Sequence, residues 1–303
     1  MIAFAGVCCV HVLSVHSSRI DVIGLDGAYT PRDVALGGTM LAHSIDHYNG
    51  VNIEEIDGNM TPEKFKRDLG FSLAEWRKDK KRGVWLKLKS PDNIDLINES
   101  VKNHGFQFHS VDVDGAVLLS NWLPVGESSS LPIGPSYYAG VGVVCISKDR
   151  KKILAVQEKN GWLKGKGYWK IVTGLADANE PIETAAEREL MEECGVKGKF
   201  KRVLALRQGK GVLKKGDLFF VCLVEPESEK LTIQQSEIER ACWMDIDEFF
   251  AQKWLASRPP YKALNMAILE SLQEESSSTA GLLLQRYDDQ DQSIFVPPSK
   301  SKS

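Results

Sequence analysis

Three glutamates lie close together in the second half of the chain, within the run GLADANEPIETAAERELMEECGV, and they are Glu189, Glu192 and Glu193. Residues three and four positions apart share one face of a helix, so these side chains would fall within an arc of roughly 100°. Like charges at that spacing repel one another and weaken a helix unless a cation lies among them. Carboxylate oxygens favour hard ions, which makes Mg²⁺ or Mn²⁺ the expected cation.

A helix that begins near Pro181 would carry these glutamates. Proline suits the first turn of a helix, because its fixed φ is helical and its missing N–H is not needed there. Ile182, Ala186 and Leu190 recur every four residues and form an apolar stripe, while Gly195 is well placed to end the helix in a left-handed conformation. The spacing therefore predicts an amphipathic helix with its acidic side chains on one face.

A solvated acidic helix face is the alternative explanation for three glutamates considered alone. The fixed offsets of the surrounding residues favour the metal site instead, and the whole stretch resembles the signature box of the Nudix hydrolases. Each fixed position of that family's box is occupied here, by Gly174, Glu180, Arg188, Glu189, Leu190, Glu192, Glu193, Gly195 and Val196. The resemblance implies metal-dependent hydrolysis of a diphosphate linkage, with Mg²⁺ or Mn²⁺ as the cofactor.

The metal ligands follow from this resemblance and from the helix geometry. Glu189 and Glu193 are expected to bind the metal chiefly, with Glu192 assisting and the backbone carbonyl of Gly174 as a further ligand. Gly174 is expected where the chain turns sharply from a strand towards the helix, a place where the lack of a Cβ matters. Arg188 would orient Glu189, so the catalytic candidates are Glu189, Arg188 and Glu192.

The remaining acidic residues have less certain roles. Glu180 is expected to support the geometry of the loop before the helix or to bind the metal through water. The general base stays open among Glu189, Glu192 and the distal Glu237, since members of the family use different glutamates.

Composition excludes several classes of function. The chain has 303 residues, 43% hydrophobic and 26% charged, which is typical of a globular protein long enough for two domains. A net charge of -3 gives no basic excess, so we expect no nucleic-acid partner. The six cysteines are scattered without a CxxC pair, which indicates reduced, mostly buried thiols. No segment is long and apolar enough to predict a membrane span.

Residues 1–18 are apolar and contain no lysine or arginine. A secretory signal needs a basic beginning and a mitochondrial presequence needs several arginines, so neither pattern is matched. We therefore treat residues 1–18 as an uncertain extension and favour a cytoplasmic protein. Organelle or secretory targeting by this segment is the alternative that stays open.

Residues 19–124 alternate short apolar runs with helical stretches, which predicts an α/β domain. The expected strands are RIDVIGL, GVNIEEI, GVWLKLK, FQFHS and AVLLSNWL. One expected helix spans Pro31 to Tyr48, a second begins at Pro62 with Thr61 as its N-cap, and a third spans Pro91 to Val101. Gly70 could break the second helix in two. His43 and His47 lie four residues apart, yet no HExxH pattern accompanies them, and ordinary polar roles are expected.

Residues 125–137 are rich in Gly, Ser and Pro and are expected to be a linker. Residues 138–275 then form the second domain. Its first two strands, AGVGVVCIS and KKILAVQE, are expected to pair across a turn at residues 148–150, and YWKIVTG leads into the box. The strands FKRVLALRQ, DLFFVCLV and ERACWMDI follow, with helices from Asp247 and from Tyr261 to Leu272. The composition of residues 276–303 is typical of a mostly disordered tail, although LLLQRY within it could still dock.

The first half of the chain indicates which subfamily the chain resembles. FSLAEWRKDKKRGVWLKL, GFQFH and NWLP, followed by AGVGVV, are similar to the region before the Nudix domain in plant-type Nudix hydrolases and in the animal protein encoded antisense to basic fibroblast growth factor. The box context WKIVTG is similar to that subfamily's WK-x-PTG, with Val172 where proline is usual. The resemblance implies a Nudix α/β/α sandwich with a mixed sheet, preceded by a smaller acetyltransferase-like α/β domain. It also implies ADP-ribose or NADH as the substrate, with AMP released.

The segment after the box departs from the subfamily. It reads LRQGKGVLKKGDLFF, in which Arg207 and Asp217 keep their places but the usual histidines are absent. Lys210, Lys214 and Lys215 bring positive charge instead. Arg207 and Lys210 are therefore the candidate substrate-binding residues, and exposed lysines that serve only solubility are the alternative.

Three other functions stay open at this stage. A Nudix fold can bind a nucleotide without cleaving it, and a Nudix hydrolase can act on another nucleotide, because specificity lies in loops that the box does not describe. Acyl transfer by the first domain is weakened by the absence of a Gly-rich pyrophosphate loop. The expected partner is a small nucleotide diphosphate substrate. Whether the chain forms a homodimer stays open.

Overall fold

The computed structural model describes residues 37–89, 92–161, 163–211, 215–255, 259–273, 282–287 and 292–296. The chain divides into two compact units with a boundary between Pro135 and Ser136. This boundary falls within the predicted linker, and β6 (Tyr137–Cys145) begins directly after it. The limits of the predicted domains stay predictions, and each unit is described below by itself.

The first unit is an α/β domain with a mixed sheet. Its strands lie in the order β1-β2-β3-β5-β4, and only β2 and β3 run parallel. The strands are β1 (Ser44–Ile45), β2 (Val51–Ile53), β3 (Gly83–Lys89), β4 (Gln107–Val111) and β5 (Ala116–Trp122). Helices α1 (Pro62–Lys78) and α2 (Ile94–Asn103) supply Phe65, Leu69, Trp76 and Leu96 to the core of this unit. Thr61 caps α1 and Pro62 occupies its first turn, as the sequence predicts.

The predicted helix from Pro31 to Tyr48 is wrong for its described part, residues 37–48, which contains irregular chain and the short strand β1. Here the backbone lies along α1 and hydrogen-bonds to its side chains, since Asp68 accepts from the N–H of Thr39 and Ser72 from that of Leu41. These bonds replace the helical ones. His43 and His47 therefore do not share a helix face, and α1 continues through Gly70 without a break. The predicted strand RIDVIGL lies outside the described residues.

The second unit is built on a four-stranded mixed sheet in the order β8-β6-β10-β9. Strands β8 (Val172–Leu175) and β9 (Gly198–Lys210) are the outer ones, and β10 (Gly216–Pro226) pairs parallel with β6. Strand β7 (Lys152–Glu158) pairs antiparallel with β11 (Ile238–Asp245) in a separate two-stranded sheet. A parallel pair needs a crossover connection, and the box helix α3 lies within the one that joins β6 to β10.

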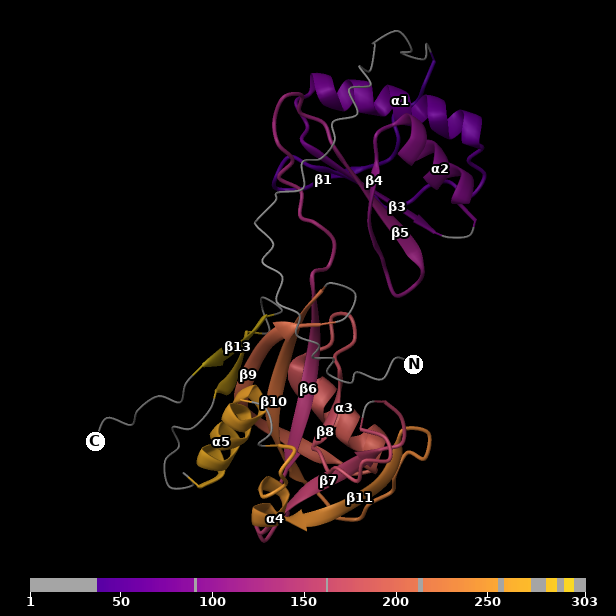
Figure 1. The fold of residues 1–303 in the computed structure, drawn as a ribbon. Helices are drawn as coiled ribbons and strands as arrows, with labels where there is room; N and C mark the ends of the chain where they lie inside the picture. Colours follow the sequence, from indigo (N-terminus) through magenta and orange to yellow (C-terminus); the bar gives the residue numbers. More distant parts are fainter. Residues whose placement is uncertain are drawn as a thin grey trace, which may run out of the picture. The chain divides into compact units, whose positions relative to one another are not determined.

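Helices cover both faces of the four-stranded sheet, as Figure 1 shows. Helix α3 (Ile182–Cys194) buries Ala186 and Leu190 against the sheet, in a core that includes Val141 and Val156. On the other face α5 (Pro259–Gln273) packs against β9 and contributes Ile268 to a second core. Helix α4 (Ile246–Phe250) lies against β7 and β11 and adds Phe249 to the same core. The predicted α/β/α sandwich with a mixed sheet is confirmed.

One strand pairing predicted for this unit is wrong, and part of the predicted tail is ordered. Strands β6 and β7 belong to different sheets and share only an isolated bridge between Ile146 and Ile153, because β6 has its two neighbours in β8 and β10. Part of the predicted disordered tail forms a hairpin of β12 (Leu283–Tyr287) and β13 (Gln292–Val296). The hairpin is preceded by Leu282, which exchanges two backbone hydrogen bonds with Val203 of β9, so the tail does dock through the LLLQRY segment.

The described cysteines are free thiols, with Cys145, Cys194 and Cys222 buried, as predicted. Among the described residues, no helix is both long and apolar enough to cross a lipid bilayer.

Gly195 ends α3 with a φ of 65°, and a Cβ at this position would lie 2.8 Å from the Cβ of Thr232. Replacing Gly195 with alanine should lower the free energy of unfolding by about 1–2 kcal/mol, since both the left-handed backbone and the contact disfavour a side chain. Urea unfolding measures the loss. Gly165→Ala is the matched control, because Gly165 also has a positive φ but has nothing within 4 Å. Equal losses in the two variants would show that the contact with Thr232 contributes nothing.

Candidate active site

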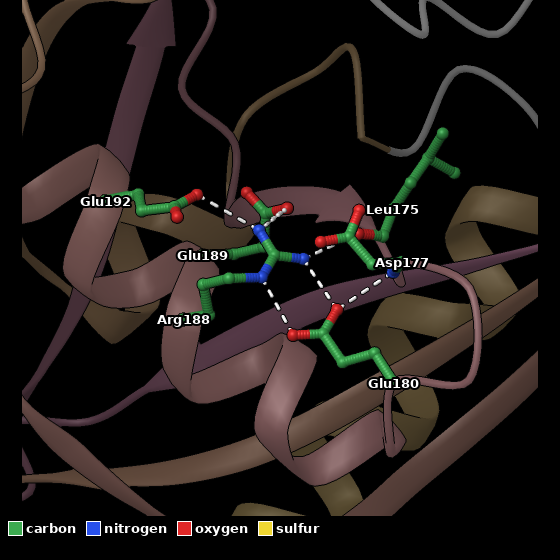
Figure 2. A network of polar contacts seen from close by, with 6 residues as sticks. All are labelled: Leu175, Asp177, Glu180, Arg188, Glu189 and Glu192. Carbon is green, nitrogen blue, oxygen red and sulfur yellow. Dashed lines mark hydrogen bonds and ion pairs between the residues drawn. The ribbon is translucent and has the colours of Figure 1, made fainter. Parts of the chain in front are cut away.

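Arg188 lies at the centre of the polar network that Figure 2 shows. Its Nε donates to Glu180 Oε1 and one Nη donates to Glu180 Oε2, both at 2.8 Å. The other Nη donates to Glu189 Oε1 at 2.8 Å and to Glu192 Oε2 at 3.0 Å. The Nη that bonds to Glu180 also donates to the carbonyl oxygen of Leu175 at 2.8 Å. Because a guanidinium has five N–H donors, these contacts use its full donor capacity.

The contacts of Arg188 join the loop before α3 to the helix itself. Glu180 receives both forks of the guanidinium and also accepts from the backbone N–H of Asp177 at 2.9 Å. These hydrogen bonds hold the pKa of Glu180 below its usual value and raise the pKa of Arg188. Pro181 follows as the N-cap of α3, one residue before the first helical position. The geometry agrees with the expected supporting role of Glu180, which stays a prediction.

Gly174 lies inside strand β8, paired with Val141, and not at a sharp turn. The sharp turn that was predicted as the reason for a glycine at this position is therefore wrong. A Cβ on Gly174 would lie 1.9 Å from the Cδ of Glu189, so the carboxylate packs directly on the glycine backbone. A side chain at this position would push Glu189 away, and Gly174 therefore fixes where that carboxylate lies.

The three box glutamates differ strongly in exposure, although they share a helix face. The side chain of Glu192 is 52% exposed and that of Glu189 is 12% exposed, while Glu193 is 5% exposed. Burial raises the pKa of Glu189 above its usual value, and Arg188 opposes this shift. Burial raises the pKa of Glu193 to about 8, and within the described residues its Oε2 has no hydrogen-bond partner. Glu189 and Glu193 thus bring buried negative charge to one place.

Glu237 is brought to the same place from a separate segment, just before β11. Its charge contributes to the raised pKa of both Glu189 and Glu193. The role of Glu237 as a distal base stays a prediction. Its backbone carbonyl accepts from the N–H of Lys159 at 2.8 Å, which ties this segment to the end of β7.

Two residues beside the box glutamates, Glu158 and Lys170, were not predicted from the sequence. Glu158 ends β7 and raises the pKa of Glu193, whereas Lys170 lowers it. Lys170 Nζ lies 2.6 Å from Glu158 Oε1, and both side chains are largely buried. A strand ending in a glutamate and the WK run before the box were visible in the sequence. Their proximity depends on an isolated bridge between Val156 and Lys170 that no local pattern indicates.

Backbone hydrogen bonds hold the end of α3 against the segment before β11. The carbonyl of Glu193 accepts from Gln234 at 3.0 Å and that of Cys194 accepts from Thr232 at 2.8 Å. The carboxylates at the site thus come from α3, β7 and this segment, each anchored to a neighbour.

Arg207 lies on the other face of the sheet from the box glutamates. It pairs with Phe219, which packs in the core beneath α4 and α5, whereas Gly174 pairs with Val141 in the core beneath α3. Directly paired residues point to the same face and successive residues alternate. The structure therefore does not bring Arg207 together with Glu189.

Asp217 accepts a hydrogen bond from Arg207, whose guanidinium lies 4.8 Å from the centre of the Phe219 ring. Lys210 is the last residue of β9, exposed, and not in the loop where it was expected. Lys215 lies over Tyr138, and Lys214 lies outside the described residues. Substrate binding by Arg207 and Lys210 stays a prediction.

The residues present suit a hard divalent cation. A buried carboxylate with a free oxygen, as in Glu193, is costly unless it is neutralised by a proton or a cation. In the described part of the chain no group of three His, Cys, Asp or Glu side chains is close enough together to hold a metal ion. Mg²⁺ typically uses one or two carboxylates with water and substrate phosphates, so Glu189, Glu193 and the Gly174 carbonyl would suffice as the protein's share.

Comparisons with known proteins identify the family of the chain. Residues 136–264 match the NUDIX domain model, and residues 41–123 match a model described as the Nudix hydrolase domain. The chain is 35% identical to Nudix hydrolase 7 of Arabidopsis thaliana over 78% of its own length and 83% of that protein. It is 38% identical to Nudix hydrolase 2 of the same plant, over 72% and 76%. It is 30% identical to human nucleoside diphosphate-linked moiety X motif 6, over 72% and 69%.

The chain therefore belongs to the Nudix hydrolase family. It is a pyrophosphohydrolase of nucleotide derivatives, in a family whose members generally use divalent metal cations.

Replacing Gly174 with alanine should lower the hydrolytic rate by about 100-fold, because the new Cβ would displace the Glu189 carboxylate. Gly209→Ala is the matched control in the same sheet, since its Cβ would meet only Asp217 at 3.9 Å. Steady-state kinetics of the two variants, beside their thermal unfolding, measure the effect. A Gly174→Ala protein that folds and keeps the parent rate would contradict the close packing of Glu189.

Proposed function

We propose that the chain hydrolyses the diphosphate linkage of ADP-ribose or NADH and releases AMP, with Mg²⁺ or Mn²⁺ as the cofactor. Support for the substrate comes from the resemblance of the front half and the WKIVTG context to plant-type Nudix hydrolases. Both halves of the chain match family models in one order, residues 41–123 before residues 136–264. The usual histidines of the subfamily are absent between Arg207 and Asp217, and this difference is the feature that most favours a different substrate.

The observation that carries the catalytic part of the proposal is the buried pair Glu189 and Glu193 beside Gly174 and Arg188. A bound divalent cation would neutralise charge on the diphosphate and activate a water molecule. Glu189 and Glu193 would hold it, together with the backbone carbonyl of Gly174. Arg188 holds Glu189 in place, and Glu180 holds Arg188. Glu192 is half exposed, which suits an assisting role through water.

We favour Glu237 as the general base over Glu189 and Glu192. Glu189 already shares its carboxylate with Arg188 and packs on Gly174, so it suits a ligand better than a proton acceptor. Glu192 accepts from Arg188 and points towards solvent. Glu237 lies in a different segment from the proposed ligands and its charge acts on both of them, so it would be available to accept a proton from water.

The second candidate is a Nudix-fold module that binds a nucleotide without cleaving it. The complete set of box glutamates, with Glu193 buried and Arg188 fully bonded, favours turnover over binding alone.

A panel of substrates separates these candidates. The protein should release AMP from ADP-ribose or NADH with Mg²⁺ or Mn²⁺, and NAD, coenzyme A and nucleoside triphosphates serve as comparison substrates. Glu193→Gln should lower the rate by about 100-fold or more, because it removes a charged ligand. Glu239→Gln, which changes an exposed glutamate beyond the site, should keep the parent rate. Binding of ADP-ribose without any product would favour the binding module.

Replacing Glu237 with glutamine separates the base from the ligands. The variant should lose about 100-fold in kcat while its affinity for Mn²⁺ stays near that of the parent, since a base accelerates proton transfer and need not hold the ion. Glu192→Gln, made in parallel, should retain most of the rate. A large loss in Glu192→Gln with a normal Glu237→Gln would exchange the two assignments.

A further inference from the structure

Lys170 carries a charged amine into the interior beside the carboxylate cluster. Its side chain is 11% exposed, its Nζ lies 2.6 Å from Glu158 Oε1, and it also donates to the hydroxyl of Thr173. The backbone of Lys170 exchanges two hydrogen bonds with Val156, at 2.8 and 3.0 Å. Main chain and amine are thus both anchored, unlike those of a surface lysine that serves solubility.

The amine also acts on one glutamate of the proposed metal site, Glu193. The charge of Lys170 favours the ionised form of Glu193, whereas the charges of Glu158, Glu189 and Glu237 each repel the Glu193 carboxylate. Charges in a partly buried site are screened less by water and salt than surface charges. A single ammonium therefore balances part of the negative charge to which a divalent cation is attracted. A cation bound there would compete electrostatically with Lys170 for the charge of Glu193.

We propose that Lys170 is a built-in counter-ion that keeps the affinity of the carboxylate cluster for a free divalent cation low. Phosphate oxygens of the substrate then complete the binding, so that the metal is held firmly only together with the nucleotide. Glu158 has the opposite effect, since its charge attracts the cation. This inference rests on the proposed metal site at Glu189 and Glu193.

The two partners of the ion pair give opposite predictions, which separates this role from a purely structural one. Breaking a structural ion pair from either side would disturb the site in the same direction. If Lys170 acts as a counter-ion, its removal tightens the binding of a free cation. Removal of the Glu158 charge weakens that binding, because the ammonium is left without its partner.

The test measures Mn²⁺ affinity of the full chain without nucleotide, from the electron paramagnetic resonance signal of free Mn²⁺ at about pH 8. Lys170→Met should bind Mn²⁺ about tenfold more tightly than the parent, and Glu158→Gln should bind it more weakly. Lys170→Arg, which keeps the charge, should stay near the parent value. Addition of ADP should reduce the difference between Lys170→Met and the parent, because the phosphates supply ligands in both proteins.

Lys87→Met is the matched control, because Lys87 Nζ also lies 2.6 Å from a carboxylate, that of Asp112 in the first unit. It should leave Mn²⁺ affinity unchanged. Unchanged or weaker binding in Lys170→Met, or a shift in the same direction in Glu158→Gln, overturns the proposal. Should Lys170→Met fail to fold, Lys170→Gln takes its place, and it must likewise bind Mn²⁺ more tightly than the parent.

Glu193→Gln distinguishes failure of this inference from failure of the metal site on which it rests. If Glu193→Gln weakens Mn²⁺ binding while Lys170→Met does not tighten it, only the role of Lys170 is wrong. If Glu193→Gln binds Mn²⁺ like the parent, the proposed metal site itself is wrong and the role of Lys170 is overturned with it.

Discussion

The active site depends on one side chain, the guanidinium of Arg188. Its donors bind Glu180, Glu189, Glu192 and the carbonyl of Leu175, and so connect a strand end, a loop and a helix. Bidentate pairing between arginine and a carboxylate fixes direction as well as distance. Lysine could not replace it, because its ammonium lacks the planar fork. The box is therefore a set of contacts around one cation, in which acidic residues otherwise repel one another.

The surrounding fold supplies what Arg188 cannot, namely burial. Helix α3 packs its small and apolar side chains on the sheet, and this places Glu193 in the interior. Burial raises the pKa of Glu193 and Glu189 and makes the charged form costly until a cation arrives. Glu158, Lys170 and Glu237 come from other segments that backbone hydrogen bonds hold together. The site thus combines a rigid frame with charge that is only partly balanced.

Much of the site could be predicted from the sequence because its parts lie close together in the chain. Residues Gly174 to Gly195 specify a strand, a loop and a helix whose local spacing fixes the contacts. The reason why position 174 requires a glycine was predicted wrongly, because its packing against Glu189 is a tertiary contact. The pairing of Glu158 with Lys170, and the opposite facing of Arg207, depend on which strands become neighbours. Local patterns do not contain that information.

The fold shows the same division. Strand β3 and the start of α1 were predicted closely, because alternation, the Thr61 cap and Pro62 act locally. The predicted helix over residues 37–48 failed where contacts with Asp68 and Ser72 replaced helical hydrogen bonds. The hairpin of β12 and β13 was missed because a serine-rich composition hid a segment that docks on Val203.

The most direct test of the metal site is anomalous diffraction from crystals grown with Mn²⁺ and a non-hydrolysable ADP-ribose analogue. We expect a manganese peak bound by Glu189 and Glu193, near the carbonyl of Gly174, with Arg188 still paired to Glu180. A peak held by Glu180 or Glu192 without Glu189 and Glu193, or metal bound only elsewhere on the chain, would contradict it.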